Sequence, residues 1–281
     1  MFRRFAYCFS FFLALFGGCF SVSAQQAAET APTPQKESNK KKDEKKNGNS
    51  AKNSTQPITG EQVVESTLFI YGLGGGRATL SQIRKTALER GKVTVTDAEG
   101  KSLQANYSRW TQRGDTLDKE RIRLEQEFPS ARYSLVFSDA KIFGIYNDSV
   151  FTPREDASKA FENQIVHGIE ALLRYKENGS TIELVRKETV EGVESYIVDL
   201  TDKENRKTRF YISTKQLRVK MLEYEDAGVK FRRKFYDYNY AQGTLVPFRT
   251  VLWADNKIVE EAEIGTVTYG QKIDENLFAA S

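Results

Sequence analysis

The sequence has very little cysteine and histidine. Cys8 and Cys19 are its two cysteines, both within the first 24 residues, and His167 is its single histidine. If those 24 residues are removed, no thiol remains for a disulfide framework, a zinc site or a nucleophile. His167 lacks the second histidine or cysteine that a metal site or a catalytic pair would need. The folded chain must therefore take its stability from a hydrophobic core.

The apolar run at the N-terminus, residues 5–16, is too short to span a bilayer as a helix. It does have the length of the hydrophobic region of a signal peptide. Arg3 and Arg4 precede it, and Val22-Ser23-Ala24 offers the small residues that signal peptidase reads. We therefore predict a signal peptide over residues 1–24 and export to the periplasm. A cut before Cys19, which would leave a lipoprotein anchored through that residue, is the alternative.

Most of the chain also lacks an excess of either charge. The formal net charge is +4, but residues 1–24 carry +2 and residues 25–57 carry +3, so residues 58–281 carry −1. A nearly neutral domain argues against a nucleic-acid partner. Residues 25–57 have no aromatic residue and no apolar period, which predicts a disordered tether rich in Lys, Asn, Gln and Ser. We interpret it as a spacer; contact of its lysines with anionic headgroups or peptidoglycan is the alternative.

Residues 58–281 contain 11 Phe and 12 Tyr, and most of their apolar residues follow the two-residue period of strands. Short turns between the strands favour an antiparallel order. The alternation predicts about eleven strands, over residues 93–95, 122–124, 133–137, 142–146, 181–187, 194–200, 207–213, 217–224, 229–240, 245–254 and 257–269.

Three segments have the period of a helix instead. Residues 60–69 and 79–88 predict two short helices, and we interpret the glycines of 72–76 between them as a turn. No Lys-Ser or Lys-Thr follows those glycines, as a phosphate loop would require. Residues 156–175 predict a longer amphipathic helix that Ser158 or Asp156 could cap.

A strongly curved sheet of this size either closes or has its concave face covered by helices. The amphipathic helix lies between the two sets of strands and is the natural plug. Its apolar face and the concave face would then form one interior, which is either a packed core or a cavity for an apolar ligand.

Motifs for catalysis are absent from the sequence. It has no Gly-x-Ser-x-Gly elbow and no metal-binding motif. Acids gather in Glu125-Gln126-Glu127 and in Glu260-Glu261-Ala262-Glu263. Adjacent side chains of a strand point to opposite faces, so we interpret these acids as solvated strand edges rather than as an acid–base pair. We therefore predict that the protein is not an enzyme and uses no cofactor or metal. His167 is interpreted as a partly buried structural residue.

Several stretches, in this order, resemble the outer-membrane lipoprotein carrier (LolA-like) family of periplasmic proteins. They are the turn of residues 96–104, Trp110-Thr111-Gln112-Arg113, Val136-Phe137-Ser138-Asp139-Ala140-Lys141 followed by Tyr146-Asn147, and near the end Tyr238, Leu245-Val246-Pro247 and Asp274-Glu275-Asn276-Leu277-Phe278. Gly114 departs from the family pattern, which has a proline there, and residues 115–119 resemble an insertion.

The resemblance implies an α+β, mainly β fold: an unclosed (half) barrel over residues 58–281, with helices plugging its concave face. It implies non-covalent binding of lipid or lipoprotein acyl chains by a monomer, with a membrane-bound donor or acceptor protein as a further partner. Arg113 matches the strand-end arginine that holds the helical lid shut, which we call the latch. The expected cavity residues are Trp110, Ile122, Leu124, Phe137, Phe143, Phe161, Ile165, Ile169 and Leu172.

Three functions fit these expectations. The first is a carrier or binder of acyl chains in the cell envelope. The second is a lipid-sensing or scaffold module with the same fold. The third is a hydrolase of envelope lipids, which the absence of catalytic motifs disfavours.

Overall fold

The computed structural model describes residues 57–97 and 99–279. The predicted signal peptide, and all of the predicted tether except Pro57, lie outside the described residues. Within the described part of the chain, no helix combines the length and the apolar character needed to cross a membrane.

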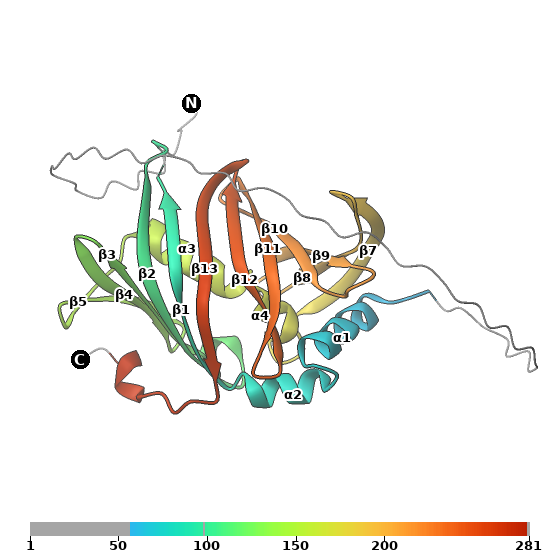
Figure 1. The fold of residues 1–281 in the computed structure, drawn as a ribbon, viewed down its shortest axis with the longest axis horizontal. Helices are drawn as coiled ribbons and strands as arrows, with labels where there is room; N and C mark the ends of the chain where they lie inside the picture. Colours follow the sequence, from blue (N-terminus) through green and yellow to red (C-terminus); the bar gives the residue numbers. More distant parts are fainter. Residues whose placement is uncertain (1–56, 98, 280–281) are drawn as a thin grey trace, which may run out of the picture. The chain divides into compact units, whose positions relative to one another are not determined.

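One antiparallel sheet dominates the fold (Figure 1). Its thirteen strands do not close into a barrel, because the order runs from β6 at one edge to β7 at the other. The prediction of a mainly β, unclosed antiparallel sheet is confirmed. The strands are β1 (Thr86–Thr96), β2 (Ser102–Gln112), β3 (Arg121–Phe128), β4 (Ala131–Ser138), β5 (Lys141–Tyr146), β6 (Ser149–Phe151), β7 (Thr181–Val190), β8 (Val193–Thr201), β9 (Lys207–Ser213), β10 (Val219–Asp226), β11 (Val229–Ala241), β12 (Thr244–Ala254) and β13 (Lys257–Tyr269).

The order of the strands explains why helices cover the concave face. Neighbours in the chain are neighbours in the sheet, except that β1 pairs with β13 in the middle and consecutive β6 and β7 form the two edges. The connection from β6 to β7 must therefore travel across the sheet. It carries α3 (Glu155–Val166) and α4 (Ile169–Leu173), whose buried residues pack on the strands. The helical plug predicted from the sequence is confirmed.

The predicted single helix over residues 156–175 is wrong in one respect, because it is broken at His167 and Gly168. Gly168 is extended, with φ −79° and ψ 171°, and a Cβ there would lie 2.9 Å from the Gln164 carbonyl oxygen. The predicted cap is also wrong. Arg154 precedes the first turn, and no side chain caps that end of α3.

Of the two predicted N-terminal helices, the first has nearly its predicted bounds and the second does not. α1 (Gly60–Tyr71) begins with a capping box, in which Thr59 and Gln62 bond each other's backbone N–H groups. α2 (Gly76–Ile83) ends earlier than predicted, since residues from Thr86 onward belong to β1 and pair with β2. Cross-strand bonding thus outweighs the helical spacing of those residues.

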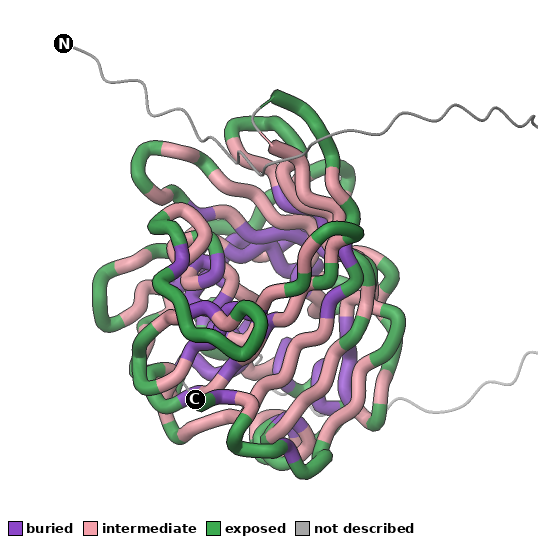
Figure 2. The backbone as a smooth tube through the Cα atoms, turned by 90° about the vertical axis from the view of Figure 1, so that its left-hand side faces the viewer, coloured by how far each residue is buried: buried purple, intermediate pink, exposed green. Residues whose placement is uncertain are grey.

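The buried residues lie along the middle of the strands and on the helices, while the turns are exposed (Figure 2). Two clusters fill the concave side. One contains Val93, Ala105, Tyr107, Ile122, Leu124, Leu135, Phe137, Phe161 and Ile165. The other joins α1 and α4 to β8–β12 and includes Leu68, Tyr71, Ile169, Leu172, Phe210, Leu222 and Phe235.

Candidate ligand-binding interior

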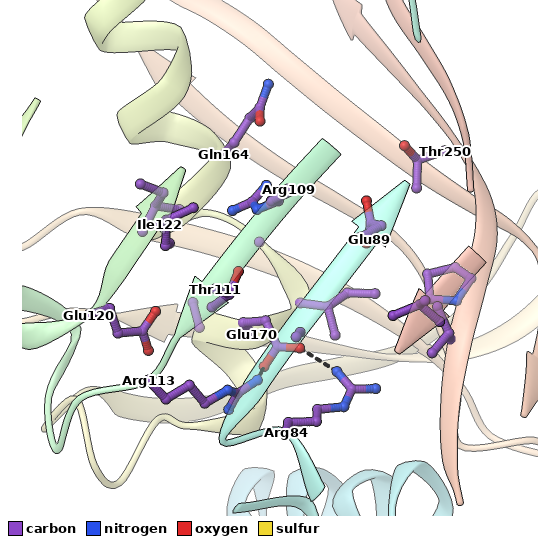
Figure 3. A pocket seen from close by; sticks show the side chains of 18 of the residues that line it. Arg84, Glu89, Arg109, Thr111, Arg113, Glu120, Ile122, Gln164, Glu170 and Thr250 are labelled. Carbon is purple, nitrogen blue, oxygen red and sulfur yellow. Dashed lines mark hydrogen bonds and ion pairs between the residues drawn. The ribbon is translucent and has the colours of Figure 1, made fainter. Parts of the chain in front are cut away.

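A cavity of about 220 Å³ lies between the helical plug and the concave face of the sheet. Its walls come from both halves of the chain. The first half supplies β1, β2 and β3, and the second half supplies α4 and β11–β13. This places the cavity beside both concave clusters and makes it the candidate binding site (Figure 3).

The cavity extends to where β12 and β13 separate. β12 pairs with β11 from Thr244 onward, but its pairing with β13 begins only at Arg249. Pro247 lies in the stretch that has no β13 partner, which suits a residue without an N–H donor. Pro247 lines the cavity together with Val267 and Tyr269, so this separation widens the interior.

Seven of the predicted cavity residues are buried on the concave side. Ile122, Leu124, Phe137, Phe161 and Ile165 belong to one cluster, and Ile169 and Leu172 belong to the other. Of these, Ile122, Ile165 and Ile169 line the cavity itself. The other four belong to the same clusters but do not line the cavity.

Trp110 and Phe143, also predicted as cavity residues, lie elsewhere. They pack against Val136, Ile273 and Phe278, under the C-terminal segment. Trp110 follows Arg109 and precedes Thr111, which both line the cavity, so strand alternation turns Trp110 to the opposite face. Phe143 is the cross-strand partner of Val136 and shares its face. Trp110 and Phe143 are therefore not part of the two concave clusters that contain the other seven predicted residues.

A charged cluster holds α4 to the strands. The Glu170 carboxylate on α4 accepts hydrogen bonds from Arg113, just after β2, and from Arg84, just before β1 (Figure 3). The side chains of Arg84 and Arg113 are only 5% and 10% exposed, whereas Glu170 is 45% exposed because it lines the cavity. Burial raises the pKa of the Glu170 carboxyl, but the charges of Arg113 and Arg84 outweigh burial and lower this pKa to about 2.

Arg174, which follows α4, makes a second connection to the same loop. It donates a hydrogen bond of 2.7 Å to the Gly114 carbonyl oxygen and pairs with Glu120. The loop between β2 and β3 thus contacts the residue at which α4 ends. The end of the plug is held at two points, Glu170 and Arg174.

Arg113 was predicted from the sequence as a site residue, whereas Arg84, Glu170 and Arg109 were not. Glu170 interrupts the apolar face of the plug helix, which was an available signal. Arg84 had no comparable signal, because its partners Glu170, Thr244 and Leu245 are distant in sequence. Among the described residues, no group of three or more His, Cys, Asp or Glu is arranged to hold a metal ion.

Comparison with known proteins supports the fold. No protein-family model matches the sequence, and no curated protein matches it either. Among solved structures, a LolA superfamily protein from Nitrosomonas europaea aligns over 79% of this chain and 98% of its own, with a TM-score of 0.57 at 12% identity. A DUF1329 family protein from Desulfovibrio piger aligns over 77% of this chain and 97% of its own, with a TM-score of 0.51 at 13% identity. The chain has a LolA-like fold.

In this LolA-like fold, Arg113 lies at the end of β2 and contacts a helix on the concave face. Its partner on that helix is the side-chain carboxylate of Glu170, which Arg113 shares with Arg84.

Proposed function

We propose that the protein is a periplasmic, non-catalytic binder or carrier of the acyl chains of lipids or lipoproteins. The observation that carries the proposal is the cavity between the plug and the sheet, to which Ile122, Ile165 and Ile169 contribute apolar walls. The LolA-like fold supports it. Residues 58–281 would form the binding domain, with a cleaved signal peptide at 1–24 and a tether at 25–57. The alternative is a lipoprotein that stays anchored to the membrane through Cys19.

The cavity, at about 220 Å³, lies below the range of about 300–1,000 Å³ that is usual for ligand pockets. An acyl chain would therefore need the plug to move outward. We expect α4 to be the element that moves, since few contacts would have to break. Glu170 on α4 and Arg174 just after it form ion pairs with the loop between β2 and β3, and these pairs keep α4 against the sheet. Breaking those pairs would enlarge the interior.

If a large side chain fills the cavity, the protein should bind acyl chains more weakly. Thr111 lines the cavity from β2, and we expect Thr111→Trp to weaken binding of a fluorescent fatty acid by at least about tenfold. Asn106→Trp is the matched control, since Asn106 is exposed on the opposite face of the same strand. Fluorescence titration of both folded variants is the measurement. Equal affinity in the two variants would place the site elsewhere, and no binding by the unaltered protein would favour a scaffold with a solid core.

Weakening the latch should favour the open form. Arg113→Leu removes one of the two guanidinium groups that hold Glu170, so the binding-competent fraction should rise and apparent affinity should increase. A charged hydrogen bond is worth about 1.5–3 kcal/mol, so we expect release of a bound fatty-acid probe to slow by about tenfold.

Stopped-flow release of the probe measures this effect, with Arg90→Leu as the control. Arg90 is exposed on β1, and no ion pair of its side chain occurs among the described residues. If Arg113→Leu and Arg90→Leu release the probe at the same rate as the unaltered protein, Arg113 does not act as a latch.

A further inference from the structure

Arg109 is a charged residue in the wall of the cavity without a charged partner. It lies on β2, where its cross-strand neighbours are Leu124 on β3 and Glu89 on β1. No ion pair or hydrogen bond of its side chain is found within the described part of the chain. Figure 3 shows its guanidinium beside Ile122 and Gln164, turned away from the Glu89 carboxylate.

The acids nearest to Arg109 are engaged with other groups. Glu89 accepts a hydrogen bond of 2.7 Å from the Tyr107 hydroxyl. The other two acids of the lining already pair with arginine, Glu170 with Arg84 and Arg113 and Glu120 with Arg174. Glu260, which is not part of the lining, pairs with Arg233. The lining itself contains four arginines and three glutamates, and two of the arginines share one glutamate. With the ion-pair partners Arg174 and Glu260 included, five arginines face four glutamates, so the lining and its partners carry one positive charge in excess.

We propose that the interior binds an anionic amphiphile, whose headgroup carboxylate or phosphate is held by the Arg109 guanidinium. This inference rests on the proposed function, and it adds the chemical class of the ligand. A guanidinium offers five donors in a planar fork that suits both anions. Ile122 and Ile165 line the same cavity, so they would contact the first part of the chain while Arg109 holds the charged end.

The charge of the headgroup is isolated by two probes with one chain. cis-Parinaric acid and its methyl ester share a fluorescent acyl chain, but only the acid is anionic well above the pKa of a carboxylic acid. We expect the unaltered protein to bind the acid at least about tenfold more tightly than the ester. Arg109→Gln should remove that preference, by weakening binding of the acid at least about tenfold more than binding of the ester.

Arg90→Gln is the matched control, because Arg90 is exposed and lies outside the cavity lining. It should keep the preference for the acid. Competition by inorganic phosphate tests whether the anion must be part of a lipid. If phosphate displaces the acid but not the ester, a free anion also occupies the site. If phosphate displaces neither probe, the anion must be attached to an acyl chain.

The failures are distinguishable. If the unaltered protein binds acid and ester equally, or if Arg109→Gln keeps the preference, the role of Arg109 is wrong while acyl binding stands. If neither probe binds, the proposed function itself is wrong.

Discussion

Glu170→Leu should lower the free energy of unfolding by about 2–4 kcal/mol. The substitution leaves Arg84 and Arg113 without their shared carboxylate, although both guanidinium groups are nearly buried. Removing one partner of a fully buried pair costs about 3–5 kcal/mol. The expected loss is smaller here because Glu170 is 45% exposed to the cavity, so water can partly replace it.

Urea unfolding measures this loss, and single substitutions of the arginines provide its internal test. Arg113→Leu should cost less than Glu170→Leu, because Glu170 keeps its bond to Arg84. Glu183→Leu is the matched control, since Glu183 is exposed on β7 and has no ion pair among the described residues. A loss from Glu170→Leu no larger than the loss from Glu183→Leu would mean that the charged cluster contributes nothing to stability.

The contribution of Glu170 to the free energy of unfolding should not change between neutral pH and about pH 5. Its pKa is about 2 in the folded protein, below the ordinary 4.5, so its contribution is complete above pH 4.5 and is lost as pH falls toward 2. The difference in unfolding free energy between Glu170→Leu and the unaltered protein should therefore stay constant over the milder range. A difference that shrinks between pH 7 and 5 would contradict the lowered pKa of Glu170.

The sheet could be predicted from the sequence because strand alternation is a local signal. The period of two in β7–β13 follows directly from residues that are buried on one face, and the plug was visible in the spacing of Phe161, Ile165 and Ile169. Two strands were missed. β6 has only three residues, all exposed, and in β2 only Ala105 and Tyr107 are buried, so neither strand has a strong alternation.

The site was less predictable because it depends on which face each strand buries. Trp110 and Phe143 are as apolar as the true interior residues, and only the register shows that they face the C-terminal segment. The charged cluster was also hidden, since Arg84 lies 86 residues before Glu170 and the two meet only after the sheet curves. Composition gave no sign that the interior would hold arginines.

His167 lies at the break between α3 and α4, and its surroundings explain why it stays neutral. It is 5% exposed, with Nδ1 2.6 Å from the Thr208 hydroxyl and its ring stacked 4.0 Å from the Tyr224 ring. Burial, followed by the charge of Arg206, lowers the pKa of His167 to about 4, and this outweighs Asp202 and Asp226, which raise it. Lys159 contributes a further, smaller lowering of this pKa.

The protein should therefore become less stable as pH falls from 6.5 to 4. In that range the folded state keeps His167 neutral while the unfolded state binds a proton there, so unfolding takes up a proton and is favoured by acid. The stability that His167 contributes is complete above pH 6.5 and is lost as pH falls through 4. A shift from 6.5 to about 4 corresponds to about 3 kcal/mol.

His167→Phe separates this contribution from the carboxylates that titrate in the same range. Phenylalanine keeps a ring against Tyr224 but binds no proton, so this variant should be less stable than the unaltered protein at neutral pH and lose less stability toward pH 4. The measurement is urea unfolding of both proteins at several pH values between 7 and 4. The gap between the two curves should narrow by about 3 kcal/mol on acidification. Parallel curves would show that His167 binds its proton equally well in the folded and unfolded chains, in which case the break between α3 and α4 is not sensitive to acid through this residue.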